Sequence, residues 1–397
     1  MKIGLVTTID TNIGDDLIRL GLTGVLDEVH GAGNIRYIAV NKHRPWTVLR
    51  SSGYRELVRL AHRVPRGRSM LQKLVDRPIG RMADSCFDDC DLIIQCGAPV
   101  FTKDCDRAEW GALLWHGTLS RIGSRIPVLN LAAGSCFPWD ERESPPVTAR
   151  TGEHIRRMHG ICRATTVRDY LARQVCASLG LRVELIPCSA LLSAPAVPEF
   201  RKKTRGERLS LLINYMHSGG HYSWGRPVDS AGWERTVREF VNRMSPRYRI
   251  RFLCHNSKEE NLARGLWPQH EIVMPATAEQ YHAVLGEVDA ALCNRLHAAV
   301  ALASIGVPSV AVGSDTRLLM VGQLNLPIHF VDDVSADSLE EEIEHLIAIR
   351  EQERERLLAL KEHTRSLYRR VLETTSRPAA VAADDAVYSG RSSVSAA

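Results

Sequence analysis

The sequence contains no run of about 18 apolar residues, the length that a membrane-spanning helix needs. None of its 10 cysteines forms a CxxC pair, which argues against a zinc site or a redox motif. The net charge is only +5, from 51 basic and 46 acidic residues, so we expect no nucleic-acid partner. The first residues show no hydrophobic segment of signal-peptide length, and we therefore expect a cytoplasmic protein with reduced thiols.

Short apolar segments alternate with helical stretches along the whole chain, which is typical of parallel α/β architecture. One of three capping boxes pairs Ser257 with Glu260 and predicts that a helix begins there. Twelve strands are predicted at residues 2–7, 35–40, 91–96, 127–133, 164–169, 182–187, 209–215, 247–255, 270–275, 289–293, 308–313 and 328–333.

We expect two Rossmann-like domains that face each other across a cleft, with chemistry in the loops that follow the strands. The Pro- and Ser-rich stretch after the sixth strand indicates a linker. The predicted divisions are an N-terminal domain at 1–190, a linker at 191–207, a C-terminal domain at 208–335, a long C-terminal helix at 336–375 and a disordered tail at 376–397.

The clearest candidate site lies in D-A-A-L-C-N-R-L-H-A, residues 289–298. The pattern predicts a strand, Asn294 as an N-cap, and a helix whose first turn carries Arg295 and His297. A cation at this end opposes the helix dipole, and a bound anion would explain it. Arginine grips phosphate or carboxylate, and a histidine beside an anion can donate a proton. The alternative is an amphipathic helix with Arg295 in solvent and His297 satisfied in the core.

Two turns of the first half are further candidates. Asn12, Gly14 and Asp15 lie where the chain turns into its first helix. Glycine lets the backbone approach a ligand, and Asp15 is either a cap or a carboxylate offered to the cleft. Gly97 follows another strand and either admits a substrate or makes a tight structural turn.

Arg168 and Asp169 stand at the carboxyl end of a strand. Either Arg168 binds an anion across the cleft, or it pairs with Asp169, which also caps the next helix. Residues 214–227 carry His217, His221 and three aromatic residues, which suit contact with a sugar or nucleotide. The glycine pair between the two histidines argues against a helical metal site, and we expect no metal.

Residues 41–83 carry 11 Lys or Arg and two Asp or Glu. This basic stretch forms a solvated face, or it attracts an anionic acceptor or the negatively charged membrane surface that carries one.

These residues resemble the polysaccharide pyruvyl transferase family. The likeness rests on N-I-G-D-D (12–16), D-L-I-I-Q-C-G (91–97), V-R-D (167–169) and above all R-L-H (295–297), with G-V-P-S-V (306–310) behind it. The sequence departs from the family pattern with C-G-A at 96–98, P-C-S-A at 187–190 and Arg317 in place of a lysine.

The resemblance implies a glycosyltransferase-B-like pair of domains that moves a pyruvyl group from phosphoenolpyruvate to a sugar of a polysaccharide, forming a ketal. It assigns Arg295 and His297 to the donor site and matches Arg168 to a second family arginine. We expect no cofactor. The further candidate substrate-binding residues are Asn12, Gly14, Gly97, His217, Asn294 and Arg317.

The donor carries a phosphate and a carboxylate, which two arginines and a helix N-terminus can neutralise. His297 would donate the proton to the donor or hold the departing phosphate, and Asp15 or Asp169 would activate the sugar hydroxyl. The acceptor would be a glycan or lipid-linked saccharide at the inner face of the membrane. Two alternatives stay open, a nucleotide-sugar-dependent glycosyltransferase and a non-catalytic glycan-binding relative.

Overall fold

The computed structural model describes residues 1–9, 12–42, 60, 63–64, 70, 86–108, 111–194, 208–220 and 227–375. Most of the basic stretch at 41–83, most of the predicted linker, His221 and the tail at 376–397 therefore lie outside the described residues.

The first half of the chain forms a parallel sheet in the order β2-β1-β3-β5-β6-β7, with the short strand β4 paired to β5. Its strands are β1 (Lys2–Thr7), β2 (Arg36–Asn41), β3 (Leu92–Cys96), β4 (Pro99–Thr102), β5 (Val128–Cys136), β6 (Ala164–Val167) and β7 (Glu184–Leu185). The strand order reverses between β1 and β3, so the loops after these strands diverge at a switch point.

The second half forms a parallel sheet in the order β10-β9-β8-β11-β12-β13. This is the Rossmann order, and its switch point lies between β8 and β11. The strands are β8 (Ser210–Asn214), β9 (Arg249–Leu253), β10 (Glu271–Val273), β11 (Ala290–Cys293), β12 (Ser309–Gly313) and β13 (Ile328–Phe330). The twelve strands predicted from sequence are all confirmed, and β4 is additional.

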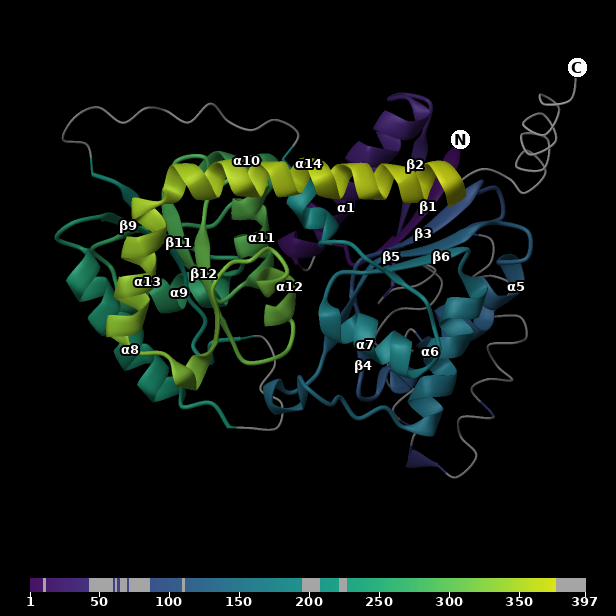
Figure 1. Ribbon diagram of the computed structural model, residues 1–397, viewed down its shortest axis with the longest axis horizontal. Coiled ribbons are helices and arrows are strands. Elements are labelled where there is room, and N and C mark those ends of the chain that lie inside the picture. Colours follow the sequence, from purple (N-terminus) through teal and green to yellow (C-terminus); the bar gives the residue numbers. More distant parts are fainter. Residues whose placement is uncertain are drawn as a thin grey trace, which may run out of the picture.

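Helices connect the strands and cover both sheets (Figure 1). In the first half they are α1 (Ile13–His30), η1 (Cys105–Arg107), η2 (Gly111–Leu119), α5 (Ser120–Ile122), η3 (Trp139–Glu141), α6 (Ala149–Ile161), α7 (Tyr170–Ser178) and η4 (Ser189–Leu192). In the second they are α8 (Ser230–Met244), α9 (Ser257–Leu266), α10 (Ala278–Leu285), α11 (Leu296–Ser304), α12 (Leu318–Gly322), η5 (Val331–Asp333), α13 (Ala336–Ala348) and α14 (Arg350–Thr375). In the described part of the chain, none is both long enough and apolar enough to span a bilayer.

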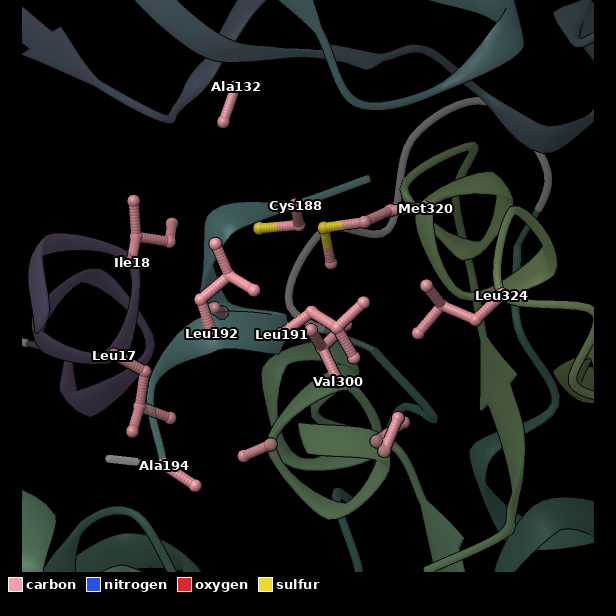
Figure 2. Close-up of a cluster of buried hydrophobic side chains, with 14 of the residues drawn as sticks. Leu17, Ile18, Ala132, Cys188, Leu191, Leu192, Ala194, Val300, Met320 and Leu324 are labelled. Carbon is pink, nitrogen blue, oxygen red and sulfur yellow. The ribbon is translucent and has the colours of Figure 1, made fainter. Parts of the chain in front are cut away.

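One hydrophobic core joins the two halves. Leu17 and Ile18 of α1, Leu191 of η4 and Val300 of α11 belong to the same buried cluster (Figure 2). Helix α11 is buried from Ala298 to Ser304, and all of these residues except Ser304 are apolar. Its burial fixes the position of its N-terminus relative to the first sheet.

The segment after β7 packs more deeply than its Pro- and Ser-rich composition indicates. Leu191 and Leu192, placed in the predicted linker, are buried in η4 between α1 and α11. The Ser189 hydroxyl donates to the Ile18 carbonyl at 3.1 Å. An apolar Ala-Leu-Leu step inside the polar stretch explains this burial. The domain limits drawn from the sequence stay a prediction.

The long C-terminal helix is confirmed as α14, but residues 336–348 form a separate helix, α13. The two differ because they cover different surfaces: α13 packs on α8 and the second sheet, whereas α14 runs across both halves (Figure 1). The Tyr368 hydroxyl donates to the Pro187 carbonyl at 3.0 Å, and the Lys361 ammonium donates to the Ser304 carbonyl at 3.0 Å. Helix α14 thus ties the first half to the second.

A second connection joins the loops after β5 and β12. The Phe137 N–H donates to the Thr316 hydroxyl at 2.8 Å, and the Thr316 N–H donates to the Phe137 carbonyl at 3.1 Å. Together with α14, this contact holds the carboxyl ends of the two sheets near each other.

Replacing Leu191 by Ala should lower the free energy of unfolding by about 2–5 kcal/mol, because the fully buried side chain leaves a cavity. Urea unfolding measures the change. The control is Met274→Ala, at a side chain that is 45% exposed, with an expected change of less than about 0.5 kcal/mol. Equal effects at the two positions would contradict a shared core between the halves.

Candidate functional site

Helix α1, which follows β1, contacts helix α11, which follows β11, through Gly14 and His297. A Cβ added at Gly14 would lie 2.5 Å from the His297 Nδ1 atom. Real Cβ atoms do not approach other atoms so closely, so only glycine lets the imidazole pack here. The structure therefore brings together two of the predicted site residues from opposite halves of the chain.

Arg168 reaches the same imidazole from the end of β6. Its side chain is 1% exposed, and its Nη1 atom lies 3.4 Å from the His297 Nε2 atom. The guanidinium also lies against Gly134 and 3.7 Å from the Cys188 Sγ atom. Its Nε atom is buried with no hydrogen-bond partner, and no carboxylate pairs with Arg168 in the part of the chain that the structure describes. A buried, uncompensated guanidinium is costly and points to an anion as its missing partner.

No hydrogen bond or ion pair joins Asp169 to Arg168, so the alternative of a local pair between them is not formed. Its carboxylate accepts from the Ser135 N–H at 2.8 Å, from the Ser135 hydroxyl at 2.7 Å and from the Ala172 N–H at 2.8 Å. The last bond caps α7, as expected. Burial raises the pKa of Asp169, and the three donors hold its oxygens in place.

The expectation that Asn294 caps α11 is wrong. Arg295 occupies the cap position, and no side chain caps the helix. The Asn294 side chain instead accepts from the Met216 N–H at 2.8 Å and donates to the Val312 carbonyl at 2.9 Å. Backbone groups at the carboxyl ends of β8 and β12 need these bonds, and they outcompete the cap. The first N–H groups of α11 thus keep their capacity for an anion.

Arg295 is fixed at both ends. Its N–H donates to the Asn214 Oδ1 atom at 2.6 Å, and its Nε atom donates to the Glu259 Oε1 atom at 3.0 Å. Its Nη2 atom bonds the same oxygen. The sequence pattern did not identify Glu259, because the predicted capping box of Ser257 and Glu260 begins one residue too late: Asn256, not Ser257, caps α9. The N-x-x-E spacing of Asn256 and Glu259 was the available signal.

Arg317 binds Asp315 through two parallel bonds, from Nε at 2.8 Å and from Nη2 at 2.6 Å. Asp315 is 2% exposed and follows β12. The guanidinium is close enough to lower the pKa of His297. Arg317 therefore lies at the edge of the site with an acidic partner, unlike Arg168.

Asn12 and Asp15 lie at the start of α1. The Asn12 side chain caps the helix by accepting from the Gly14 N–H at 3.1 Å, and it donates to the Asp15 Oδ2 atom at 3.1 Å. Asp15 remains half-buried, with one oxygen bonded by the amide. Capping thus accounts for Asn12, while the role of Asp15 stays a prediction.

The structure gives Gly97 and His217 other surroundings. A Cβ at Gly97 would lie 3.1 Å from atoms of both Ala132 and Ile18, which favours the tight structural turn. The His217 Nδ1 atom lies 3.9 Å from a Glu234 carboxylate oxygen on α8, and its side chain is 59% exposed. Among the residues that the structure describes, no hydrogen bond or ion pair joins Gly97 or His217 to Arg168 or His297.

The pKa of His297 reflects the burial and the positive charges of the site. Burial lowers the pKa of His297 well below its usual range, and nearby basic groups lower it further: Arg168, Arg317, His255 and Arg295. The neutral form therefore prevails until a negative charge enters. Such a site is suited to bind an anion and to protonate the imidazole when the anion arrives.

Replacing Gly14 by Ala should lower the free energy of unfolding by about 1–3 kcal/mol, since the new methyl group overlaps the His297 ring. Gly24 of the same helix has no heavy atom within 4 Å of the corresponding position. Gly24→Ala should therefore raise the unfolding free energy by about 0.5–1 kcal/mol. Urea unfolding of both variants checks the opposite signs, and two stabilising substitutions would contradict the Gly14–His297 contact.

The protein should lose stability as the pH falls from about 6.5 towards 4. Burial, then Arg295, lowers the pKa of His255 to about 4, whereas an unfolded histidine titrates near 6.5. As the pH falls, the unfolded state binds the proton first. Each buried histidine with a lowered pKa therefore reduces the free energy of unfolding by about 1.4 kcal/mol per pH unit in this window. Denaturant unfolding at several pH values should show a shallower dependence of the unfolding free energy on pH for His255→Asn than for the parent protein.

Comparison with solved structures shows a glycosyltransferase-B-like fold. The chain is similar to S. aureus MnaA in complex with UDP, with 11% identity, a TM-score of 0.52 and coverage of 90% of this chain and 91% of the other. It is similar to UDP-GlcNAc 2-epimerase from Neisseria meningitidis bound to UDP-GlcNAc, with 11% identity, a TM-score of 0.52 and coverage of 94% and 100%. Identities this low establish the fold alone. A comparison with curated proteins found no match.

A comparison with protein families gives a match over most of the chain. The family model described as polysaccharide pyruvyl transferase matches residues 12–316, which include Gly14, Arg168, Arg295 and His297. The matched region begins at the cap of α1 and ends at Thr316, so it includes every strand of the two sheets except β1 and β13. The chain belongs to the polysaccharide pyruvyl transferase family.

Proposed function

We propose that this transferase moves the pyruvyl group of phosphoenolpyruvate to a pair of hydroxyls on a glycan, forming a ketal. The observation that carries the proposal is the buried Arg168 guanidinium, 3.4 Å from the His297 imidazole and without a carboxylate partner among the described residues. A buried guanidinium beside an imidazole favours a negatively charged ligand, and phosphoenolpyruvate carries two anionic groups.

The donor has two anionic groups, and the site offers donors for both. Arg168, the uncapped N-terminus of α11 and the Nη1 side of Arg295 can bind the phosphate and the carboxylate. Glu259 occupies the Nε side of Arg295, so the guanidinium keeps its other edge for the ligand. Arg317 is held by Asp315 and adds longer-range positive potential.

His297 is proposed as the proton donor. Burial and the neighbouring basic groups lower the pKa of His297, and an anion beside the imidazole would offset the repulsion from those groups and favour its protonated form. Transfer of this proton to the methylene carbon of phosphoenolpyruvate gives a methyl group and a positive neighbouring carbon, which a sugar hydroxyl attacks. Phosphate departs with the electrons of its C–O bond, and the second hydroxyl closes the ketal. One hydroxyl proton restores the imidazole, and the other leaves with phosphate.

Asp15 is the better candidate for the base that activates the hydroxyl. Its carboxylate is half-buried beside Gly14, one residue from the His297 contact. Asp169 is fully engaged by Ser135 and Ala172, and its oxygens are not available for a substrate proton. A polysaccharide or a lipid-linked saccharide would supply the hydroxyl pair, with the latter placing the reaction at the inner face of the membrane.

Arg295→Ala and His297→Asn should each reduce the rate of phosphate release from phosphoenolpyruvate, in the presence of a glycan acceptor, by at least about 10²-fold. Each removes charge stabilisation or proton transfer at the donor. Arg264→Ala is the control, because Arg264 pairs with Glu260 on the exposed side of α9 and should leave the rate unchanged.

Isothermal calorimetry with phosphoenolpyruvate and UDP-GlcNAc distinguishes the alternatives. Binding of phosphoenolpyruvate to the parent protein, with a lower affinity in Arg168→Met, supports phosphoenolpyruvate as the pyruvyl donor. Exclusive binding of the nucleotide sugar would favour a glycosyltransferase instead, and binding of a glycan with no phosphate release from any acceptor would favour a non-catalytic relative.

A further inference from the structure

A buried carboxylate stands behind Arg295. The Glu259 side chain belongs to a residue that is 6% exposed, and its two oxygens accept from four donors. Its Oε1 atom accepts from Arg295 Nε at 3.0 Å, from Arg295 Nη2 and from Asn256 Nδ2 at 2.8 Å. Its Oε2 atom accepts from the His255 N–H at 2.9 Å. The loop between β9 and α9 is thus folded around this one carboxylate.

The start of α9 decides which glutamate points inwards. Because Asn256 is the N-cap, Glu259 is the third helical residue and turns towards the carboxyl end of the sheet. The next residue, Glu260, faces outwards and pairs with Arg264 at 2.8 Å. Two adjacent glutamates on one helical turn therefore serve different purposes.

The contacts restrain Arg295 at its backbone and at the end of its side chain. Asn214 accepts from its N–H at 2.6 Å, and Glu259 holds the Nε side of its guanidinium. The long side chain of a free arginine samples many rotamers, and an anion would have to order it on binding. Here the order exists beforehand, and the Nη1 atom keeps no hydrogen-bond partner among the residues that the structure describes.

We propose that Glu259 is a positioning residue, which fixes the direction in which Arg295 offers its guanidinium to the anionic donor. The carboxylate would repel the donor directly, so it acts through Arg295 and not on the substrate. This inference rests on the proposed function only in that Arg295 binds the donor anion.

A double-mutant cycle tests this role, with Glu259→Ala, Arg295→Ala and the double variant titrated calorimetrically with phosphoenolpyruvate. In the parent background, Glu259→Ala should weaken binding about tenfold, because Arg295 loses its fixed geometry. In the Arg295→Ala background the same change should weaken binding less than about twofold. A merely structural role would lower affinity by the same factor in both backgrounds.

Matched variants control for folding and charge. Glu260→Ala removes the neighbouring, outward carboxylate and should leave binding unchanged. Glu259→Gln keeps the side-chain volume and one acceptor oxygen, so its affinity should lie between those of the parent and Glu259→Ala. Where Glu259→Ala does not fold, as judged by circular dichroism, Glu259→Gln takes its place in the cycle with the same pattern and a smaller effect of about threefold.

The outcomes separate this inference from the proposed function. An unchanged affinity in Glu259→Ala, or an equal loss in both backgrounds, overturns the positioning role. A parent protein that binds phosphoenolpyruvate but releases no phosphate with glycans overturns the proposed reaction and leaves the cycle readable. A parent that binds neither phosphoenolpyruvate nor inorganic phosphate overturns both.

Discussion

The site depends on one unfavourable contact, a buried guanidinium placed against a neutral imidazole. Arg168 is 1% exposed and has a buried Nε atom without a partner, and its Nη1 atom lies 3.4 Å from His297. Interiors do not retain such a charge without a compensating gain. Here the gain would come from a ligand, whose negative charge completes an arrangement that the rest of the fold holds in place.

The fold accommodates this contact because glycines, which have no side chain, lie where Arg168 and His297 pack. Gly14 admits the His297 ring, and Gly134 lies against the Arg168 guanidinium. The buried helix α11 and the segment η4 fix the second half against α1, and α14 ties both halves from outside. The position of the imidazole is therefore set by the shared core as much as by its own helix.

The other basic residues differ in how far they are neutralised. Arg317 has a bidentate partner in Asp315, and Arg295 shares one oxygen of Glu259. Arg168 has no carboxylate partner among the described residues. Because Arg317 and Arg295 are paired with carboxylates and Arg168 is not, the unpaired positive charge lies at the junction of the two halves.

The alternation of apolar and helical segments in the sequence determined the twelve predicted strands, because strand and helix periodicities are local properties. The family motifs likewise located Gly14, Arg168, Arg295 and His297, since each follows a strand at its carboxyl end. Only the tertiary structure decided which polar groups pair. Asn294 bonds neighbouring strands instead of capping α11, Asp169 bonds Ser135, and Glu259 turns inwards where Glu260 turns out. These choices depend on which backbone and side-chain groups meet from distant parts of the chain, and no local pattern contains that information.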